Sequence, residues 1–317
     1  MKRSITRVST LFTTVFILTL GWFAASYANE QGANEGFILF STDRDNPDMD
    51  LLCPACEEIY VMLPDGSSQT RITKNVFNDK APVWSHSKKL IAFHSNRRGG
   101  PPEIFVMNLD GTDIRLVASL GTRGAQFASF SHNGNELCFN SMTMPREIFI
   151  VDVHGQGLTN LTNHPSDDSR CAWSPKGNDI VFSSSRDGNS EIYVMNADGS
   201  APVRLTTNTA SDTNPAWSPK ADRIAFESTR DGNSEIYVMT ADGSSEPVRL
   251  THFPGLDTKP SWSPEGDRIA FHRQIDGHLQ VHTIDAVDGS GIVSMITDTP
   301  SPGFSGFPSW GKWAAQP

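Results

Sequence analysis

The stretch Arg-Asp-Gly-Asn-Ser-Glu-Ile-Tyr-Val-Met occurs twice in the chain, at residues 186–195 and again at residues 230–239, an offset of 44. Degraded copies of the same frame place an aromatic residue or a histidine at the equivalent position every 44 or 45 residues, at Tyr60, Phe105, Phe149, Tyr193, Tyr237 and His282. A fixed period of this length indicates a repeat architecture in which each copy forms one small supersecondary unit.

One complete copy, from Pro215 to Thr251, contains four short runs rich in β-branched and aromatic residues. Pro, Asp-Gly and Gly-Asn turn signals separate the runs, and none has the length or the spacing of a helix. A second series marks the first run of each copy, at Trp84, Phe130, Trp173, Trp217, Trp262 and Trp310. Four strands per copy predict the blade of a β-propeller, a small sheet that buries its faces only against neighbouring blades.

The two ends of the repeat region predict how the ring closes. The first copy begins at Gly36 without its Trp strand, whereas the chain finishes with an additional one, Phe307-Pro308-Ser309-Trp310. We therefore expect an all-β, six-bladed propeller of four-stranded blades, in which the C-terminal strand completes the first blade. A hydrophobic fraction of 37% is ample for the core of such a domain.

The combined pattern from Pro215 to Thr251 resembles the WD-like repeat of TolB-type propellers. Its elements are Pro-Ala-Trp-Ser-Pro, Ile-Ala-Phe, Arg-Asp-Gly-Asn-x-Glu-Ile-Tyr-Val-Met and Arg-Leu-Thr. The resemblance covers roughly residues 36–313, and the α/β domain that precedes the propeller in TolB has almost no room here. It implies an exported binding module at the cell envelope. Related repeats precede serine peptidases, but the Gly-x-Ser-x-Gly motif of a hydrolase is absent from the sequence.

The N-terminus has the organisation of a secretory signal peptide. Lys2, Arg3 and Arg7 precede an apolar run, and residues 24–28 end in a small-x-small cleavage site. A retained membrane anchor is the alternative, but the run is shorter than the roughly 20 apolar residues of a membrane span. We predict cleavage of residues 1–28 and a single propeller domain over residues 29–317, exported to the periplasm or the extracellular space and not inserted in the membrane.

The charge balance limits the partners. With 26 Lys and Arg against 36 Asp and Glu, the chain has a formal charge of -10. Nucleic-acid binding is excluded because it needs clustered basic residues, and docking on an anionic lipid surface is disfavoured. We expect a monomer with a protein or peptide ligand.

Two columns of the repeat are candidate ligand sites, because the first strand of each propeller blade faces the axial channel. Five positions before the Trp series stand four aspartates, Asp79, Asp168, Asp212 and Asp257. They would either form an acidic ring that attracts a metal ion or a cationic peptide, or accept hydrogen bonds from turn N–H groups. Three positions before the Trp series the residue does not follow the repeat, and the six positions carry five residue types: Ala81, Phe127, Arg170, Asn214, Lys259 and Phe307. We expect a variable residue that faces the channel to determine which ligand binds, and Arg170, Asn214 and Lys259 are the preferred ligand candidates.

Other polar motifs are interpreted as structural. The Asp-Gly-Asn turns offer too few oxygens for calcium, and we expect Gly188 and Gly232 to adopt positive φ in hairpin turns. A third column follows the second strand of each copy, at Ser41, His94, Asn140, Ser183, Glu227 and His272. His94, Glu227 and His272 have the side chains of a metal or acid/base group, which is the alternative, but they come from blades two, five and six and are interpreted as polar surface. We therefore predict no catalytic residues, no metal and no cofactor.

The cysteines fall into two pairs by context. Cys53 and Cys56 lie in an irregular insertion, and without a second pair at zinc-site spacing they are predicted to form a local disulfide after export. Free thiols, an adventitious metal or redox activity are the alternatives. Cys138 and Cys171 replace an Ala and a Pro of the repeat and are interpreted as small buried apolar residues.

Two functions remain open at the level of sequence. The first is a non-catalytic protein- or peptide-binding scaffold that acts through its channel mouth and loops. The second is a propeller enzyme, a lyase or hydrolase, that acts on a carbohydrate or small molecule in the axial pocket. The fold alone does not choose between them.

Overall fold

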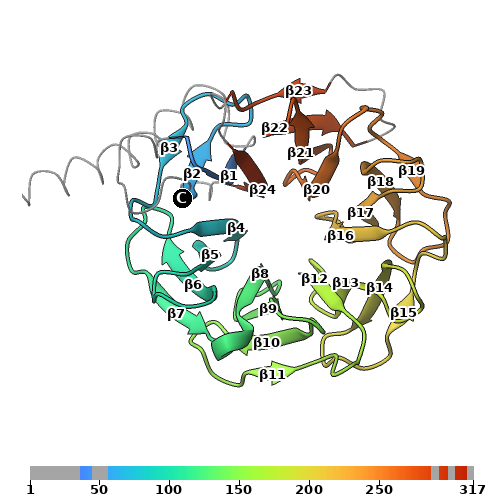
Figure 1. Ribbon diagram of the computed structural model, residues 1–317, viewed down its shortest axis with the longest axis horizontal. Coiled ribbons are helices and arrows are strands. Elements are labelled where there is room, and N and C mark those ends of the chain that lie inside the picture. Colours follow the sequence, from blue (N-terminus) through green and yellow to red (C-terminus); the bar gives the residue numbers. More distant parts are fainter. Residues whose placement is uncertain (1–35, 45–55, 287–292, 299–303, 313–317) are drawn as a thin grey trace, which may run out of the picture.

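The computed structural model shows six four-stranded antiparallel sheets arranged as a ring around a central axis (Figure 1). The structure describes residues 36–44, 56–286, 293–298 and 304–312. In the described residues the one short helical turn is the 3-10 helix η2 (Gly121–Arg123). The prediction of an all-β, six-bladed propeller is confirmed.

The strands of each blade run from the channel outward. Blade one consists of β24 (Ser305–Gly311), β1 (Phe37–Thr42), β2 (Glu58–Met62) and β3 (Thr70–Arg71). Blade two consists of β4 (Asp79–Ser85), β5 (Leu90–Ser95), β6 (Glu103–Asn108) and β7 (Arg115–Ala118). Blade three consists of β8 (Ala125–Phe130), β9 (Glu136–Ser141), β10 (Ile148–Asp152) and β11 (Thr159–Asn160). Blade four consists of β12 (Asp168–Trp173), β13 (Asp179–Ser184), β14 (Glu191–Asn196) and β15 (Val203–Arg204). Blade five consists of β16 (Asp212–Trp217), β17 (Arg223–Ser228), β18 (Glu235–Thr240) and β19 (Val248–Arg249). Blade six consists of β20 (Asp257–Trp262), β21 (Arg268–Ile275), β22 (His278–Asp285) and β23 (Ser294–Met295).

The C-terminal strand closes the ring as predicted. Strand β24 pairs antiparallel with β1, so that Trp310 lies opposite Ile38 and Ser309 lies opposite Leu39. The first blade thus combines both ends of the repeat region, which lie side by side in Figure 1. The blade cannot form until the last strand has been added, and this couples the termini to the stability of the whole ring.

The apolar core is divided among the junctions between blades. Each of six buried clusters joins two adjacent blades, including the junction between blades six and one, where Val281 packs with Phe40 and Trp310. Two members of the Trp series add polar contacts across such junctions, because Trp217 Nε1 donates to the carbonyl oxygen of Ala172 and Trp262 Nε1 to that of Ala216. Every junction between adjacent blades among the described residues is therefore packed with apolar side chains, including the junction that closes the ring.

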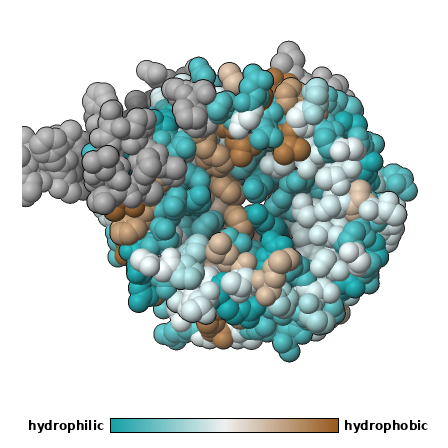
Figure 2. Space-filling view, viewed as in Figure 1, coloured by the Kyte–Doolittle hydropathy of each residue, from teal (hydrophilic) through white to brown (hydrophobic). Residues whose placement is uncertain are grey.

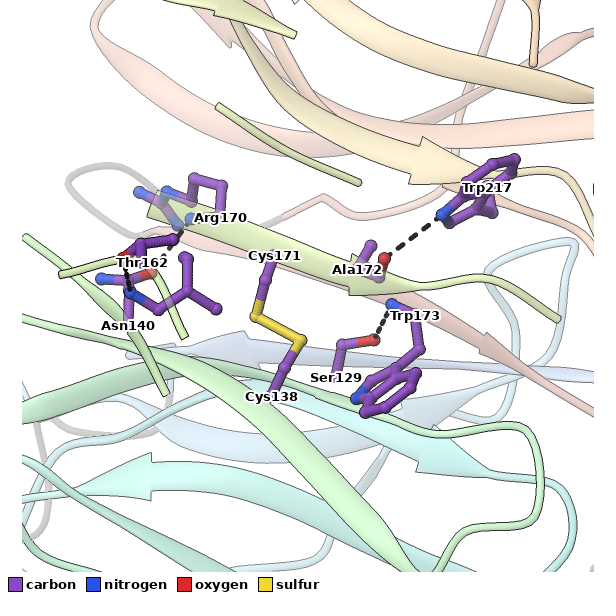
Figure 3. The surroundings of a disulfide bond; sticks show 10 residues. Ser129, Cys138, Asn140, Thr162, Arg170, Cys171, Ala172, Trp173 and Trp217 are labelled. Atoms are coloured by element: carbon purple, nitrogen blue, oxygen red, sulfur yellow. Dashed lines mark hydrogen bonds between the residues drawn. A yellow bond between two sulfur atoms is a disulfide. The ribbon is translucent and has the colours of Figure 1, made fainter. Parts of the chain in front are cut away.

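Figure 3 shows a disulfide between Cys138 of β9 and Cys171 of β12, which links blade three to blade four. Both residues are buried, as predicted, but the interpretation as small apolar residues missed the bond between them. The cause is geometric. The second strand of one blade packs against the first strand of the next, which brings the two Cα atoms to 6.3 Å, within the range of a disulfide. Cys171 also lies on the innermost strand, one residue after Arg170.

The repeated Arg-Asp-Gly-Asn-x-Glu motif serves the blades. In blade five, Asn233 Nδ2 donates to the carbonyl oxygens of Phe253 and Gly255 in the segment that leads to the next blade. Glu235 accepts hydrogen bonds from Arg249 and Thr251 of the blade's outer edge, and Asp231 accepts one from the Tyr237 hydroxyl. These contacts occupy the motif's polar side chains within the fold.

The turn itself has the conformation expected from the sequence. Gly188 and Gly232 have φ angles of 111° and 103°, which confirms the prediction of positive φ at these positions. No helix within the described ranges is long and apolar enough to cross a membrane. Residues 1–28, the predicted signal peptide, lie outside the described residues.

Candidate functional site

A β-bulge on the innermost strand aims one side chain of each blade toward the axis. At this bulge the residues three positions before the Trp series all have positive φ, between 49° and 59°: Ala81, Phe127, Arg170, Asn214, Lys259 and Phe307. None is glycine, and a left-handed conformation at a non-glycine residue costs roughly 1–2 kcal/mol. The ladders on both sides of the bulge hold this geometry, since pairing shifts at this point in every inner strand.

The six bulge residues line a single cavity of about 130 Å³ on the axis of the ring. The remaining lining comes from the residues that follow each bulge: Pro82, Val83, Ala128, Cys171, Pro215, Pro260 and Pro308. Figure 2 shows the hollow at the centre of the disc. The predicted ligand candidates Arg170, Asn214 and Lys259 are therefore brought together by the structure, and each comes from a different blade. We call this cavity the channel pocket.

One half of the channel pocket is aromatic. The rings of Phe127 (blade three) and Phe307 (blade one) lie 5.8 Å apart between centroids. The blade between them contributes Ala81, whose methyl group is small enough to leave that space to the two rings. The small side chain at the bulge of this blade therefore allows the phenylalanines of the two neighbouring blades to contact each other.

The other half of the channel pocket is cationic and polar. The Arg170 guanidinium lies 3.2 Å from the centroid of the Phe127 ring, and Lys259 Nζ lies 4.4 Å from that of Phe307. Both geometries are cation–π contacts. Asn214 stands between the two cations in the order of the blades and donates from Nδ2 to Glu227 Oε2 at 2.6 Å. Among the described residues, neither cationic side chain forms an ion pair within 4.0 Å.

Burial weakens the charged forms of both cations. It lowers the pKa of Lys259 to about 8, with the charge of Arg170 adding to the effect. Burial likewise lowers the pKa of Arg170 to about 9, against an opposing contribution from Glu227. Two partly desolvated positive charges that destabilise each other are an arrangement that an anion would relieve.

The interpretation of His94 and His272 as polar surface is wrong, because both side chains are buried. Strand register places them behind the bulge of the next blade. His94 contacts the Phe127 ring edge-on at 5.1 Å, and His272 does the same with Phe307 and also accepts a hydrogen bond from the Phe307 amide. Burial lowers the pKa of His94 to about 3 and that of His272 well below its usual value, so both are neutral at pH 7.

Two other residues of the same column have related roles. Asn140 Oδ1 accepts a hydrogen bond from the Arg170 amide, and Ser41 Oγ accepts one from the Ala81 amide. The end of the second strand therefore anchors the backbone of the bulge in the following blade. Sequence reasoning missed this role because the column lists polar residues of many types, and only strand register shows that they lie behind the channel wall.

The four aspartates of the predicted acidic ring are completely buried, with no exposed surface. Each forms an ion pair with an arginine of its own blade, at distances between 2.6 and 3.1 Å: Asp79 with Arg97, Asp168 with Arg186, Asp212 with Arg230, and Asp257 with Arg273. They do not line the channel pocket. Of the two roles considered from sequence, hydrogen-bond acceptance agrees with this placement, with arginine side chains as donors. A ligand would reach these carboxylates only by displacing the arginines.

Two further predictions concern the cysteine insertion and metals. The predicted Cys53–Cys56 disulfide involves Cys53, which lies outside the described residues. In the described part of the chain, no cluster of three or more His, Cys, Asp or Glu side chains is arranged to hold a metal ion.

Fold and site together define a closed six-bladed propeller whose candidate ligand site is an axial pocket with one aromatic and one cationic half. The chain belongs to the family described as "TolB beta propeller domain", which matches residues 25–169, 122–215 and 211–301.

Solved structures show the same fold at low sequence identity. TolB from Acinetobacter baumannii is 20% identical, with a TM-score of 0.75 over 91% of this chain and 70% of that one. The putative TolB from Agrobacterium tumefaciens is 20% identical, with a TM-score of 0.65 over 88% and 98%. Hydrazine synthase from Kuenenia stuttgartiensis is 16% identical, with a TM-score of 0.70 over 87% of this chain and 47% of that one.

Proposed function

We propose that this chain is an exported, non-catalytic scaffold that binds a protein or peptide at the cell envelope through its channel mouth and the surrounding loops. One observation carries the proposal. The residues that repeat from blade to blade have their polar groups engaged in the architecture, whereas the six bulge residues that line the channel pocket are of five different types. A propeller presents a binding site as a set of variable side chains on a repeated structural frame.

The placement of the two nearby histidines supports binding rather than acid–base chemistry by these residues. The two histidines nearest the channel pocket are buried behind Phe127 and Phe307 and held neutral. A general acid or base must reach its substrate within hydrogen-bond distance. The fold itself does not decide the question, since proteins with quite different names share it.

The experiment compares capture of an envelope partner by matched variants. The protein spanning residues 29–317 is immobilised and exposed to an envelope extract, and bound proteins are identified after cross-linking. Arg170→Ala and Lys259→Ala alter the channel pocket, whereas Lys220→Ala removes an exposed lysine from a turn.

We expect both channel variants to lose a protein that the wild type and Lys220→Ala retain. Equal capture by all four proteins would overturn the channel mouth as the binding surface. Turnover of an oligosaccharide panel by the pure protein would establish the enzyme alternative instead.

Export is tested separately on the full-length chain. Its N-terminal sequence after expression in a bacterium, together with fractionation of the periplasm, reports cleavage and location. We expect a mature chain that begins near Asn29. An intact N-terminus in the cytoplasmic or membrane fraction would contradict export or cleavage.

A further inference from the structure

We propose that the channel pocket is a receptor for a single carboxylate group, bound by Arg170 and Lys259 on either side of Asn214. The inference deepens the proposed function and rests on it for the nature of the ligand, a peptide or protein segment that brings the carboxylate into the channel. The charge of this receptor is opposite to that of the acidic ring, which was one of the two roles considered for the aspartate column in the sequence.

The order of the bulge residues around the axis supports this assignment. Following the blades, the pocket residues are Ala81, Phe127, Arg170, Asn214, Lys259 and Phe307. The two cations therefore flank Asn214, and each is followed on its far side by the phenylalanine over which it lies. Arg170 and Lys259 lie 89 positions apart in the sequence, yet the fold directs both side chains into one cavity.

Both cations are fixed before any ligand arrives. Arg170 is placed by the bulge, by the hydrogen bond from its amide to Asn140, and by the Phe127 ring beneath its guanidinium. A guanidinium held in this way offers its planar set of donors to a carboxylate with little additional loss of side-chain freedom. Preorganisation of this kind reduces the entropic cost of binding.

The local charges favour an anion with one negative charge. Lys80 and Glu57 neutralise each other in an ion pair of 2.5 Å. Glu227, which accepts hydrogen bonds from Asn214 and Ser234, offsets one of the two remaining cations. One positive charge of the set Lys80, Arg170, Lys259, Glu57 and Glu227 is therefore left without compensation. A carboxylate matches this excess, whereas a phosphate dianion or a metal cation does not.

The size and the aromatic half of the cavity set the rest of the ligand. A volume of about 130 Å³ is close to that of an engineered cavity, roughly 150 Å³, that holds one benzene molecule. The inner part of the channel pocket is thus of the size of one chemical group. Phe127 and Phe307 form an apolar wall that suits the hydrocarbon part of the residue that carries the carboxylate.

Calorimetric titration with defined probes tests the inference. The probes are N-acetyl-Ala-Ala-Phe with a free C-terminal carboxylate, the same peptide as its C-terminal amide, N-acetyl-Ala-Asp-Ala amide, and inorganic phosphate. The first and third carry a carboxylate from the two sources a protein offers, a chain end and an acidic side chain. The variants are Lys259→Met, Lys259→Arg and Arg170→Met, with Lys220→Met as the matched control.

We expect a carboxylate probe to bind roughly tenfold or more tightly than the uncharged amide, because it gains charge-assisted hydrogen bonds. Lys259→Met and Arg170→Met should each abolish that preference, while Lys259→Arg and Lys220→Met retain it. Unchanged thermal unfolding midpoints would show that the variants are folded. The probe that binds better identifies the source of the carboxylate.

The contrary outcomes separate this inference from the proposed function. The carboxylate receptor would be overturned if neither carboxylate probe binds more tightly than the uncharged amide, or if phosphate binds more tightly than both. The capture experiment would then still decide the scaffold function. Conversely, carboxylate binding that depends on Lys259, together with protein capture that does not, would overturn the scaffold function at the channel mouth and leave the receptor.

Discussion

Arg170 and Phe127 occupy the same bulge position of neighbouring blades, and the guanidinium of one lies 3.2 Å from the ring centroid of the other. The pair shows how a repeated backbone position produces a pocket that is specific to this chain. The bulge and its positive φ repeat in every inner strand, so each blade delivers one side chain to the same cavity. Contacts between those side chains then depend only on which residues the six positions carry.

The buried aspartates are expected to stabilise the blades, and Asp212→Asn tests this. Asp212 has no exposed surface and pairs with Arg230 at 2.9 Å, so the substitution leaves a partly buried guanidinium without its counter-charge. Breaking such a pair costs about 3–5 kcal/mol. Urea denaturation measures the free energy of unfolding.

The control is Glu265→Gln, which removes an exposed partner of Lys312 and should change stability by less than about 1 kcal/mol. Similar losses in the two variants would show that Asp212 contributes no more than a surface charge. Retained stability in Asp212→Asn, with altered ligand capture, would return this position to the list of ligand-binding residues.

The disulfide between blades three and four is expected to be closed in the isolated protein and to support the ring. Cys138 and Cys171 are separated by 33 residues in sequence, a loop for which a disulfide contributes about 2–4 kcal/mol. The double variant Cys138→Ala, Cys171→Ala should therefore unfold at lower urea concentration than the wild type.

Alkylation under denaturing conditions, followed by mass spectrometry of the peptides, reports the state of this disulfide directly. We expect modification of both cysteines only after reduction. Modification of Cys138 or Cys171 without reductant would contradict the disulfide.

The sequence predicted the blades because the information is local and repeated. A period of 44 residues, turn signals at fixed places and a displaced Trp strand suffice to define six sheets and their closure. The placement of Arg170, Asn214 and Lys259 at the channel could be predicted for a related reason. They break the repeat at a position that propeller geometry directs toward the axis.

The remaining features depend on contacts that strand register creates. Ser228 lies opposite Asp212, so Arg230, two residues further on, can turn back to the carboxylate and neutralise it. The charge of the proposed acidic ring could not be judged without this pairing. The disulfide likewise requires the distance between adjacent blades. Its signal in the sequence was the coincidence of Cys138 and Cys171, two departures from the repeat in consecutive copies.

Acid is expected to destabilise the channel wall through His94. Burial lowers the pKa of His94 to about 3, whereas an unfolded histidine has a pKa near 6.5. Between these values the unfolded state binds a proton that the folded state does not, so stability falls as the pH drops from 6.5 toward 3. His94→Gln should remove this contribution and flatten the dependence of the free energy of unfolding on pH.

Urea denaturation at pH 7, 5.5 and 4.5 makes the comparison, with His132→Gln, at an exposed position, as the control. We expect the difference between wild type and His94→Gln to change by up to about 1.4 kcal/mol per pH unit below 6.5. A parallel pH dependence in all three proteins would contradict the neutral, buried state of His94.

The bulge conformation predicts effects of different size for two substitutions of Ala81. Its φ angle of 49° is unfavourable for alanine and more so for a β-branched residue, but it is accessible to glycine. Ala81→Gly should therefore change stability by less than about 1 kcal/mol, while Ala81→Val should destabilise by about 1–3 kcal/mol. Thermal unfolding of both variants measures the effect. A more stable Ala81→Val variant would show that the bulge relaxes readily and is not a fixed support for the channel residues.

Binding of a carboxylate probe is expected to weaken as the pH rises from 7 to 8.5. The pKa of Lys259 is lowered to about 8 in the free protein, so the lysine loses its charge within this interval. A bound anion favours the protonated lysine, and binding near pH 8 must therefore take up protons. The groups that act on this lysine are Arg170, Lys80, Glu227 and Glu57.

Calorimetry in two buffers with different ionisation enthalpies measures the proton uptake. The wild type should bind a fraction of a proton with the ligand at pH 8, whereas Lys259→Met should take up less. Among the histidines nearby, His94 and His272 are already neutral below this range and do not contribute to the change. A Kd that stays constant between pH 7 and 8.5, with the same proton uptake in both proteins, would show that the charge of Lys259 does not act on the ligand.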